Sequence, residues 1–181
     1  MILKTKRLLL KTLDESYAEE VLEFYKKNII FLKEWEPERN NDFYKIGVHK
    51  LNLRNDVLKN EKKELFRVWI FRSGEEKILG TVALSNIIYG VFKSCHLGYK
   101  FDKDEVGKGY AIESVKKVIE YGFNELKLHR IEANIMPKNK RSLNLVKKLG
   151  FEEEGLAKNY LKINGEWEDH LHMVKFNEKI I

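Results

Sequence analysis

The chain has 181 residues, enough for one domain that buries a hydrophobic core without disulfides or metal ions. Its 34 basic and 28 acidic side chains give a formal charge of +6 and are spread along the chain, which argues against direct nucleic-acid readout and is compatible with an anionic ligand. The single cysteine, Cys95, excludes an internal disulfide and a cysteine-rich metal site. Because no run of about 18 apolar residues occurs, we expect a cytoplasmic protein without a membrane anchor.

The first third of the chain predicts a strand and two helices. Residues 2–13 are expected to form the strand, and Asp14 can cap a helix with one apolar face. A second amphipathic helix is expected over 43–59, and its apolar face is marked by Tyr44, Val48, Leu51 and Leu58. Between the two helices, the segment 31–39 is expected to be a loop centred on Trp35-Glu36-Pro37.

Three strands are predicted next, over 65–72, 78–87 and 92–101. Short turns that contain glycine join them, so we expect an antiparallel meander. In the first of these strands, apolar residues at even positions alternate with a set that includes Arg67 and Trp69. Its two faces should therefore lie in different environments.

The rest of the chain alternates helices and strands before a final hairpin. The apolar pattern predicts a helix over 110–126, a strand over 129–136, a helix over 139–149, and a hairpin of 151–163 and 167–176 around Asn164-Gly165. The central strand, helix, strand and helix should form a right-handed crossover. The sequence thus predicts one domain over 1–181, of the α/β (α+β) class, with helices against a mixed sheet.

A loop with two glycines, 104–111, lies between the meander and the helix that follows it. Gly107 and Gly109 allow the backbone to turn tightly, and the first-turn amides of the helix have no intrahelical partner. Such a helix start favours a diphosphate by roughly 0.3 to 2 kcal/mol, besides direct hydrogen bonds. On spacing alone an ordinary strand-to-helix turn fits equally well. A dinucleotide-binding fold is disfavoured, because Ile112 stands where its third glycine would be.

Several sequence blocks follow one another in a fixed order: VGKGYA at 106–111, HRIEAN at 129–134, PKNKRS at 137–142, and LGF followed by Glu154-Gly155. In order and spacing they resemble the GNAT superfamily. Within it, FKSCHLGY at 92–99, the segment 157–170 and Trp35-Glu36-Pro37 resemble the RimJ-type ribosomal-protein-alanine N-acetyltransferases. The likeness covers nearly the whole chain and is strongest from 92 to 170.

The resemblance implies the GNAT fold, a mostly antiparallel mixed sheet of about seven strands, splayed at its centre and flanked by about four helices. It also implies acetyl-CoA as the cosubstrate, and no metal. The residues that it implies for coenzyme binding are Leu97, Gly98 and Tyr99 along the pantetheine arm, Val106, Gly107, Lys108, Gly109, Tyr110 and Ala111 around the pyrophosphate, and Asn139. Asp104 replaces the glutamine or arginine that begins the loop in the family, a departure that affects one phosphate contact.

The next helix begins at 137–142, where Asn139 is suited to be its N-cap. In many GNAT enzymes a tyrosine further along this helix protonates the departing thiolate, and that position is Val146 here. A serine three residues after the asparagine takes this role in the RimJ and RimL branch. The resemblance therefore implies Ser142 as the general acid or as the hydrogen-bond donor to the thiolate.

The implied reaction is direct attack of a neutral amine on the acetyl thioester, whose carbonyl is polarised by a backbone amide such as that of Leu97. Cys95 is expected to be a packing residue rather than a nucleophile. The base, direct or through water, is one of several residues among which the sequence does not choose: Glu36, His96, Asp169 and His170. Residues expected to line the acceptor pocket are Trp35, Glu36 and Tyr160.

An α-amine is the expected acceptor. Removing its proton at pH 7 costs about 1.4 kcal/mol, whereas removing the proton of a lysine side chain costs almost 5 kcal/mol. The resemblance implies the N-terminal alanine of a small-subunit ribosomal protein, free or on the ribosome. Two alternatives stay open: an acetyltransferase for a polyamine or aminoglycoside, which an acidic pocket would favour, and a non-catalytic acyl-CoA sensor or ribosome-associated binding protein, which would not need Ser142. A monomer and a homodimer are equally compatible with the sequence.

Overall fold

A computed structural model describes residues 1–179, in which one sheet of eight strands packs against five α-helices. In chain order the elements are β1 (Ile2–Lys4), β2 (Leu8–Lys11), α1 (Ala18–Lys27), α2 (Ile29–Lys33), α3 (Ile46–Glu61), β3 (Phe66–Arg72), β4 (Ile78–Ile88), β5 (Ser94–Phe101), α4 (Tyr110–Asn124), β6 (Arg130–Ile135), α5 (Lys140–Lys148), β7 (Glu152–Ile163) and β8 (Glu166–Phe176). Short 3-10 turns are η1 (Glu15–Tyr17), η2 (Asn41–Tyr44) and η3 (Lys103–Glu105). The mixed α/β class is confirmed, with one strand and one helix more than expected.

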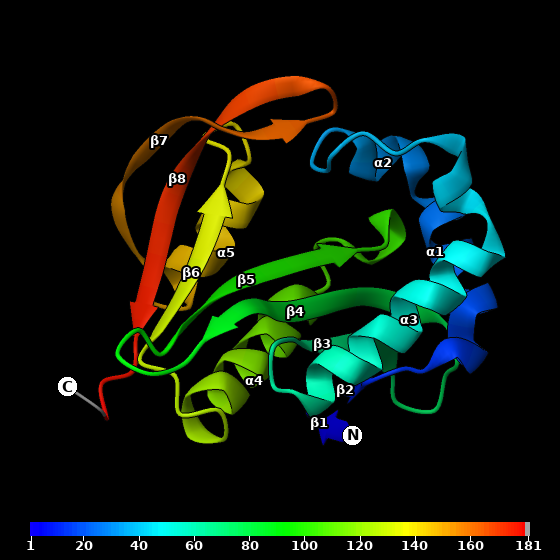
Figure 1. The fold of residues 1–181 in the computed structure, drawn as a ribbon, viewed down its shortest axis with the longest axis horizontal. Helices are drawn as coiled ribbons and strands as arrows, with labels where there is room; N and C mark the ends of the chain where they lie inside the picture. The colour runs from blue at the N-terminus through cyan, green and yellow to red at the C-terminus, as the bar shows by residue number, and fades with distance from the viewer. Residues whose placement is uncertain (180–181) are drawn as a thin grey trace.

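The sheet order is β1-β2-β3-β4-β5-β6-β8-β7. Neighbouring strands are antiparallel except β5 and β6, which are parallel, so the predicted meander of β3, β4 and β5 is confirmed. The β5–β6 pairing extends from Ser94 to His96 and no further along β5. Beyond His96 the two strands diverge, as Figure 1 shows, and this is the central splay that we expected.

Helices cover both faces of the sheet, and β3 shows why. Val68 and Ile70 point into a core shared with α4, whereas Trp69 and Phe71 point into a second core shared with α1 and α3. The two predicted environments of this strand are therefore two hydrophobic cores. Within residues 1–179, no helix has both the length and the apolar character that crossing a membrane requires.

The first predicted strand, 2–13, is in fact a hairpin. Strands β1 and β2 pair antiparallel with each other, and the chain reverses between them. The turn is fixed by Glu113 of α4, whose carboxylate accepts hydrogen bonds from the Thr5 hydroxyl at 2.6 Å and from the Arg7 amide at 3.0 Å. A single continuous strand was expected because this tertiary contact leaves no mark in the local apolar pattern.

The apolar face predicted for the second helix was wrong. Leu51 and Leu58 are 56% and 50% exposed on α3, while His49 and Leu53 are buried. His49 stacks on the ring of Tyr25 at 5.4 Å, so an aromatic polar residue supplies the contact that the pattern had assigned to leucines. The segment 31–39 also differs from expectation, because its first residues end helix α2.

The β7–β8 hairpin lies across the molecule from α1, α2 and α3 (Figure 1). Asn164 and Gly165 at its tip have φ angles of 46° and 87°, as a tight hairpin turn requires. The Asn164 amide donates to the Glu36 carbonyl at 2.9 Å, so the tip is attached to the loop that follows α2. These two segments close over the splay between β5 and β6.

Candidate functional site

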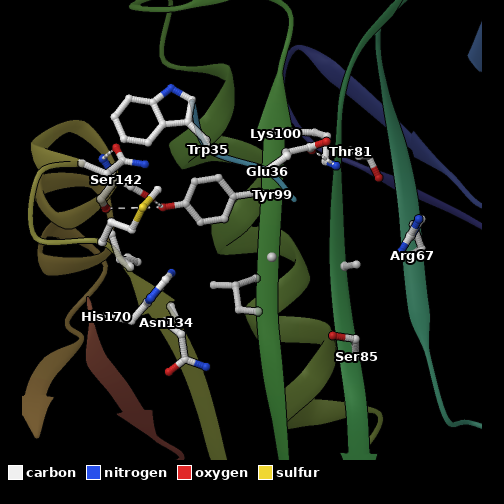
Figure 2. A pocket seen from close by; sticks show the side chains of 17 residues that line it. Trp35, Glu36, Arg67, Thr81, Ser85, Tyr99, Lys100, Asn134, Ser142 and His170 are labelled. Carbon is white, nitrogen blue, oxygen red and sulfur yellow. Dashed lines mark hydrogen bonds and ion pairs between the residues drawn. The ribbon is translucent and has the colours of Figure 1, made fainter. Parts of the chain in front are cut away.

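A cavity of about 320 Å³ occupies the splay. Its walls come from β3, β4, β5, β6 and β8, the start of α5 and the loop after α2. The sequence-predicted residues that it brings together are Trp35, Glu36, Leu97, Gly98, Tyr99, Asn139, Ser142 and His170. Figure 2 shows Tyr99 on one side of the gap and Ser142 and His170 on the other.

Ser142 lies in the first turn of α5, and Asn139 holds it there. The Asn139 side chain caps the helix by accepting a hydrogen bond from the Ser142 amide at 3.1 Å. The Ser142 hydroxyl lies 2.5 Å from the phenol oxygen of Tyr99, which reaches across the splay from β5 (Figure 2). The cavity therefore contains two hydroxyls in direct contact.

Burial controls the ionisation of two groups on β5. It raises the pKa of Tyr99 to about 12, although the hydrogen bond with Ser142 acts in the opposite direction. Burial, followed by the nearby Glu132 carboxylate, likewise raises the pKa of the Cys95 thiol to about 12. Both groups stay protonated at neutral pH. Cys95 is 1% exposed in the core against α4, where it packs as a small apolar residue.

His170 comes from β8, is 3% exposed, and extends into the cavity (Figure 2). Its Nδ1 lies 3.0 Å from the Glu168 carbonyl oxygen. Because a carbonyl can only accept, Nδ1 carries the hydrogen, and the lone pair of the neutral ring is on Nε2. The ring of Tyr160 lies beside that of His170, with 5.7 Å between centroids, but Tyr160 is not among the residues that line the cavity.

Trp35 and Glu36 reach the cavity from the loop after α2 (Figure 2). The Glu36 carboxylate forms ion pairs with Lys100 of β5 and with Arg39, the latter at 3.4 Å. With its main chain held by Asn164, this residue is fixed on three sides. It forms a rigid wall at the end of the cavity nearest the hairpin tip.

Two of the four candidate bases lie outside the cavity. His96 lies where β5 and β6 still pair, and its Nε2 is 3.9 Å from the Glu132 carboxylate. Asp169 accepts a hydrogen bond from the Asn159 amide at 2.8 Å, so it stabilises an irregular position of the hairpin. Glu36 and His170 are the two candidates that face the cavity.

The loop that begins α4 has the geometry of an anion site. Gly107 and Gly109 have φ angles of 84° and 80°, a region that favours glycine. Gly109 is the N-cap, and no side chain caps this 15-residue helix. A Cβ atom at Gly107 would meet nothing within 4 Å, so the space beside it is open. An uncapped helix start with open space beside it fits a diphosphate group.

Hydrogen bonds and ion pairs of charged residues hold this loop in place. Arg7 donates to the Lys108 carbonyl at 3.0 Å, and the Lys108 ammonium contacts Glu105 at 2.9 Å. Asp104, the departure from the family pattern, forms an ion pair with Lys27 at 2.6 Å. Asp104 thus ties the loop to α1 in place of the side chain that the family has there.

Sequence reasoning missed six polar groups of the cavity wall: Arg67, Thr81, Ser85, the Tyr99 hydroxyl, Lys100 and Asn134. Each is a polar residue within a strand that is otherwise rich in apolar residues. Such residues indicate a wetter face of a sheet, but sequence alone does not tell which strands lie side by side. The order and pairing register of the strands, which are known only from the fold, place these residues around the same cavity.

Comparisons with known proteins agree with this geometry. Residues 7–152 match the family model described as an acetyltransferase (GNAT) domain. The chain is 38% identical over 169 residues to the probable N-acetyltransferase YjcK of Bacillus subtilis, covering 93% of both chains. It is 38% identical over 171 residues to the ribosomal protein uS5-alanine N-acetyltransferase of Escherichia coli, covering 93% of this chain and 87% of that one. A crystal structure of the ribosomal-protein-S5-alanine acetyltransferase from Vibrio fischeri superposes with a TM-score of 0.93 at 33% identity, covering 98% and 97% of the two chains.

Proposed function

The chain belongs to the GNAT acetyltransferase family and is an acetyl-CoA-dependent N-acetyltransferase, and from this premise we propose that it acetylates the N-terminal alanine amine of a ribosomal protein. The proposal draws on the relatives of about one-third identity, which carry that activity in their names. It extends to the chain as one catalytic domain, 1–181, and to a cytoplasmic location.

The charge of the cavity favours a peptide amine over a polyamine. Among the described residues that line it, Glu36 is the only carboxylate, and Lys100 and Arg67 are cations. Lys100 and Arg39 already pair with Glu36. A polycation would meet excess positive charge here, whereas an α-amine loses its own charge at little cost before it reacts.

The coenzyme site in this proposal uses two backbone segments. The uncapped amides from Val106 to Ala111 would hold the pyrophosphate, and the open edge of β5 at Leu97, Gly98 and Tyr99 would pair with the pantetheine arm like an added strand. Bound there, acetyl-CoA supplies an activated acetyl group. The chain itself contributes position, proton acceptance and hydrogen bonds.

His170 is the proposed base. It lines the cavity and its Nδ1 is held by the Glu168 carbonyl, which leaves Nε2 to accept a proton, whereas the oxygens of Glu36 are engaged by two cations. The amine nitrogen becomes more acidic as it bonds to the acetyl carbon, and His170 accepts its proton. Within the cavity, burial of His170 keeps bulk water from competing for that proton.

Tyr99 and Ser142 are proposed to stabilise the departing sulfur. A thiol has a pKa near 8.5, and Tyr99 has one near 12, so full proton transfer from Tyr99 to the thiolate would be uphill by roughly 5 kcal/mol. Hydrogen bonding is the favourable mode: Tyr99 donates to Ser142, and Ser142 donates to the sulfur. The pair lowers the barrier without changing its own protonation state.

The observation on which the proposal rests is that Ser142 and His170 line the same cavity, at the splay between β5 and β6. The test measures acetylation of peptides that begin with alanine, serine or methionine, of spermidine and of an aminoglycoside, by wild type and His170→Gln. Wild type should prefer alanine peptides at least tenfold, and the variant should lose at least tenfold in kcat/KM at pH 7. Efficient acetylation of spermidine with no alanine product would refute the acceptor; an unaffected variant would refute the base.

A further inference from the structure

Three polar atoms of cavity-lining residues are buried without a hydrogen-bond partner among the described residues; one, Oε1 of Glu36, is in an ion pair with Lys100, and the other two have no charged partner at that atom. These two are Oδ1 of Asn134 on β6 and Nε of Arg67 on β3. Figure 2 shows these side chains on opposite sides of the cavity, with β4 and β5 between them. Buried polar groups in folded proteins are normally paired, so each points to a missing ligand group.

The two atoms have opposite requirements. The amide oxygen of Asn134 can only accept, and the Nε–H of Arg67 can only donate. An acceptor peptide would meet both requirements in one direction: its amine end would lie at β6, on the wall that also includes Ser142 and His170, and its oxygen-bearing groups would lie at β3. The wall therefore sets the direction of the bound peptide.

The sheet also sets the spacing. Two paired strand intervals of about 4.8 Å separate β5 from β3, roughly 10 Å in all, and the splayed gap between β5 and β6 lies beyond them. An extended peptide advances about 3.4 Å per residue, so three steps from an amine at the splay beside β5 would bring its fourth residue to Arg67 on β3.

Arg67 has capacity to bind a carboxylate there. Its ion pair with Asp56 of α3 is 3.5 Å long, beyond the 2.7–2.9 Å typical of a charge-assisted hydrogen bond. The Arg67 side chain is 32% exposed. A guanidinium can hold a carboxylate through two parallel N–H donors, one of which is Nε–H.

Resting on the proposed function, we propose that Arg67 is a carboxylate-binding subsite that selects acceptor peptides with Glu or Asp at their fourth residue. The floor of the cavity from β6 to β3 is the track on which such a peptide lies. This subsite gives the enzyme selectivity beyond the first residue.

The test uses peptides of eight residues that begin with alanine and carry one glutamate, moved through positions 2 to 6, each paired with its glutamine counterpart. In wild type, kcat/KM for Glu at position 4 should exceed that for Gln by about tenfold, chiefly through KM. Arg67→Gln should bring this ratio close to one, and Arg67→Glu should prefer Lys at position 4. The matched control is Arg54→Gln, an exposed arginine on α3 that pairs with Glu15 outside the cavity, and it should keep the wild-type ratio.

Equal rates for Glu and Gln at every position, or an unchanged ratio in Arg67→Gln, would overturn the subsite while leaving alanine acetylation intact. Failure to acetylate any of these peptides would instead count against the proposed function, so the two ideas fail separately. Thermal unfolding of each variant confirms that it is folded.

Discussion

At the scale of single residues, the contact between Tyr99 and Ser142 makes a prediction about how two hydroxyls share one task. Because they act in series, removing either should remove most of the hydrogen bond to the sulfur. Ser142→Ala and Tyr99→Phe should each lower kcat at least tenfold. The double variant should be little worse than the poorer single one.

Steady-state kinetics on an alanine peptide and calorimetry with CoA provide the measurement. CoA affinity should change little in all three variants, since the coenzyme is held mainly by backbone groups in this proposal. Losses that multiply in the double variant, to a hundredfold or more, would show that the two hydroxyls act independently. Unchanged turnover in Ser142→Ala would remove it from the mechanism.

Individual site residues could be predicted from the sequence more readily than the side chains with which they interact. Ser142 and His170 were both expected, and both line the cavity, although their roles remain proposals. The phenol of Tyr99 was not expected, because it reaches Ser142 across 43 residues of chain and only through the splay of β5 from β6. Arg67 was missed as a site residue for the same reason.

At the scale of elements, the loop before α4 makes a prediction that separates ligand contact from backbone strain. Gly107 and Gly74 both have a φ of 84°, and a Cβ at either would meet nothing within 4 Å. Alanine at either position should therefore cost a similar 1–2 kcal/mol of stability. Only Gly107→Ala places a methyl group beside the proposed pyrophosphate.

Calorimetry with CoA and thermal unfolding should distinguish the two variants. Gly107→Ala should weaken CoA binding at least tenfold, while Gly74→Ala in the β3–β4 turn should bind CoA like wild type. The anion site would be misplaced if both variants bound CoA equally well. An equal loss of affinity in both would indicate strain alone.

Elements with a strong apolar period were predicted within a few residues. The helix expected at 110–126 is Tyr110–Asn124, and the terminal hairpin differs at its ends by one residue in each strand. The errors arose where tertiary contacts decide: His49 instead of leucines faces the core on α3, and Glu113 turns the first strand into a hairpin. Periodicity reports which residues can be buried, but not which partner buries them.

At the scale of the whole molecule, the site is assembled from segments that are distant in sequence. The loop after α2 and the β7–β8 hairpin meet at one hydrogen bond, from the Asn164 amide to the Glu36 carbonyl. Residues of both segments line the cavity or hold its lining, and the rest of the wall comes mainly from strands β3 to β6 of the central sheet. The two ends of the chain therefore both contribute to acceptor binding in the proposed function.

Stability against acid is a property of the whole molecule, and it should depend on Glu105, a buried carboxylate in the turn before α4. It contacts Lys108 at 2.9 Å, Lys77 at 3.0 Å and Arg72 at 3.2 Å. Burial opposes its ionisation, but the hydrogen bonds and charges of Lys108 and Lys77 outweigh burial and hold its pKa below the ordinary value. The Glu105 carboxylate therefore binds a proton less readily in the folded state than in the unfolded state.

The sign of the pH effect follows from this depressed pKa. The contribution of Glu105 is present in full above the unfolded pKa, near 4.3, and is lost as the pH falls through the lower folded pKa. Glu105→Gln should lower the free energy of unfolding by about 1–3 kcal/mol at pH 7, less than for a fully buried pair because the cations are partly exposed. Near pH 3 the difference from wild type should shrink, since Glu105 is then protonated in the unfolded state, which reduces what its ionisation contributes to stability. Urea unfolding at both pH values measures this, with exposed Glu20→Gln as the control; a difference that stays constant with pH would show that Glu105 acts through packing rather than charge.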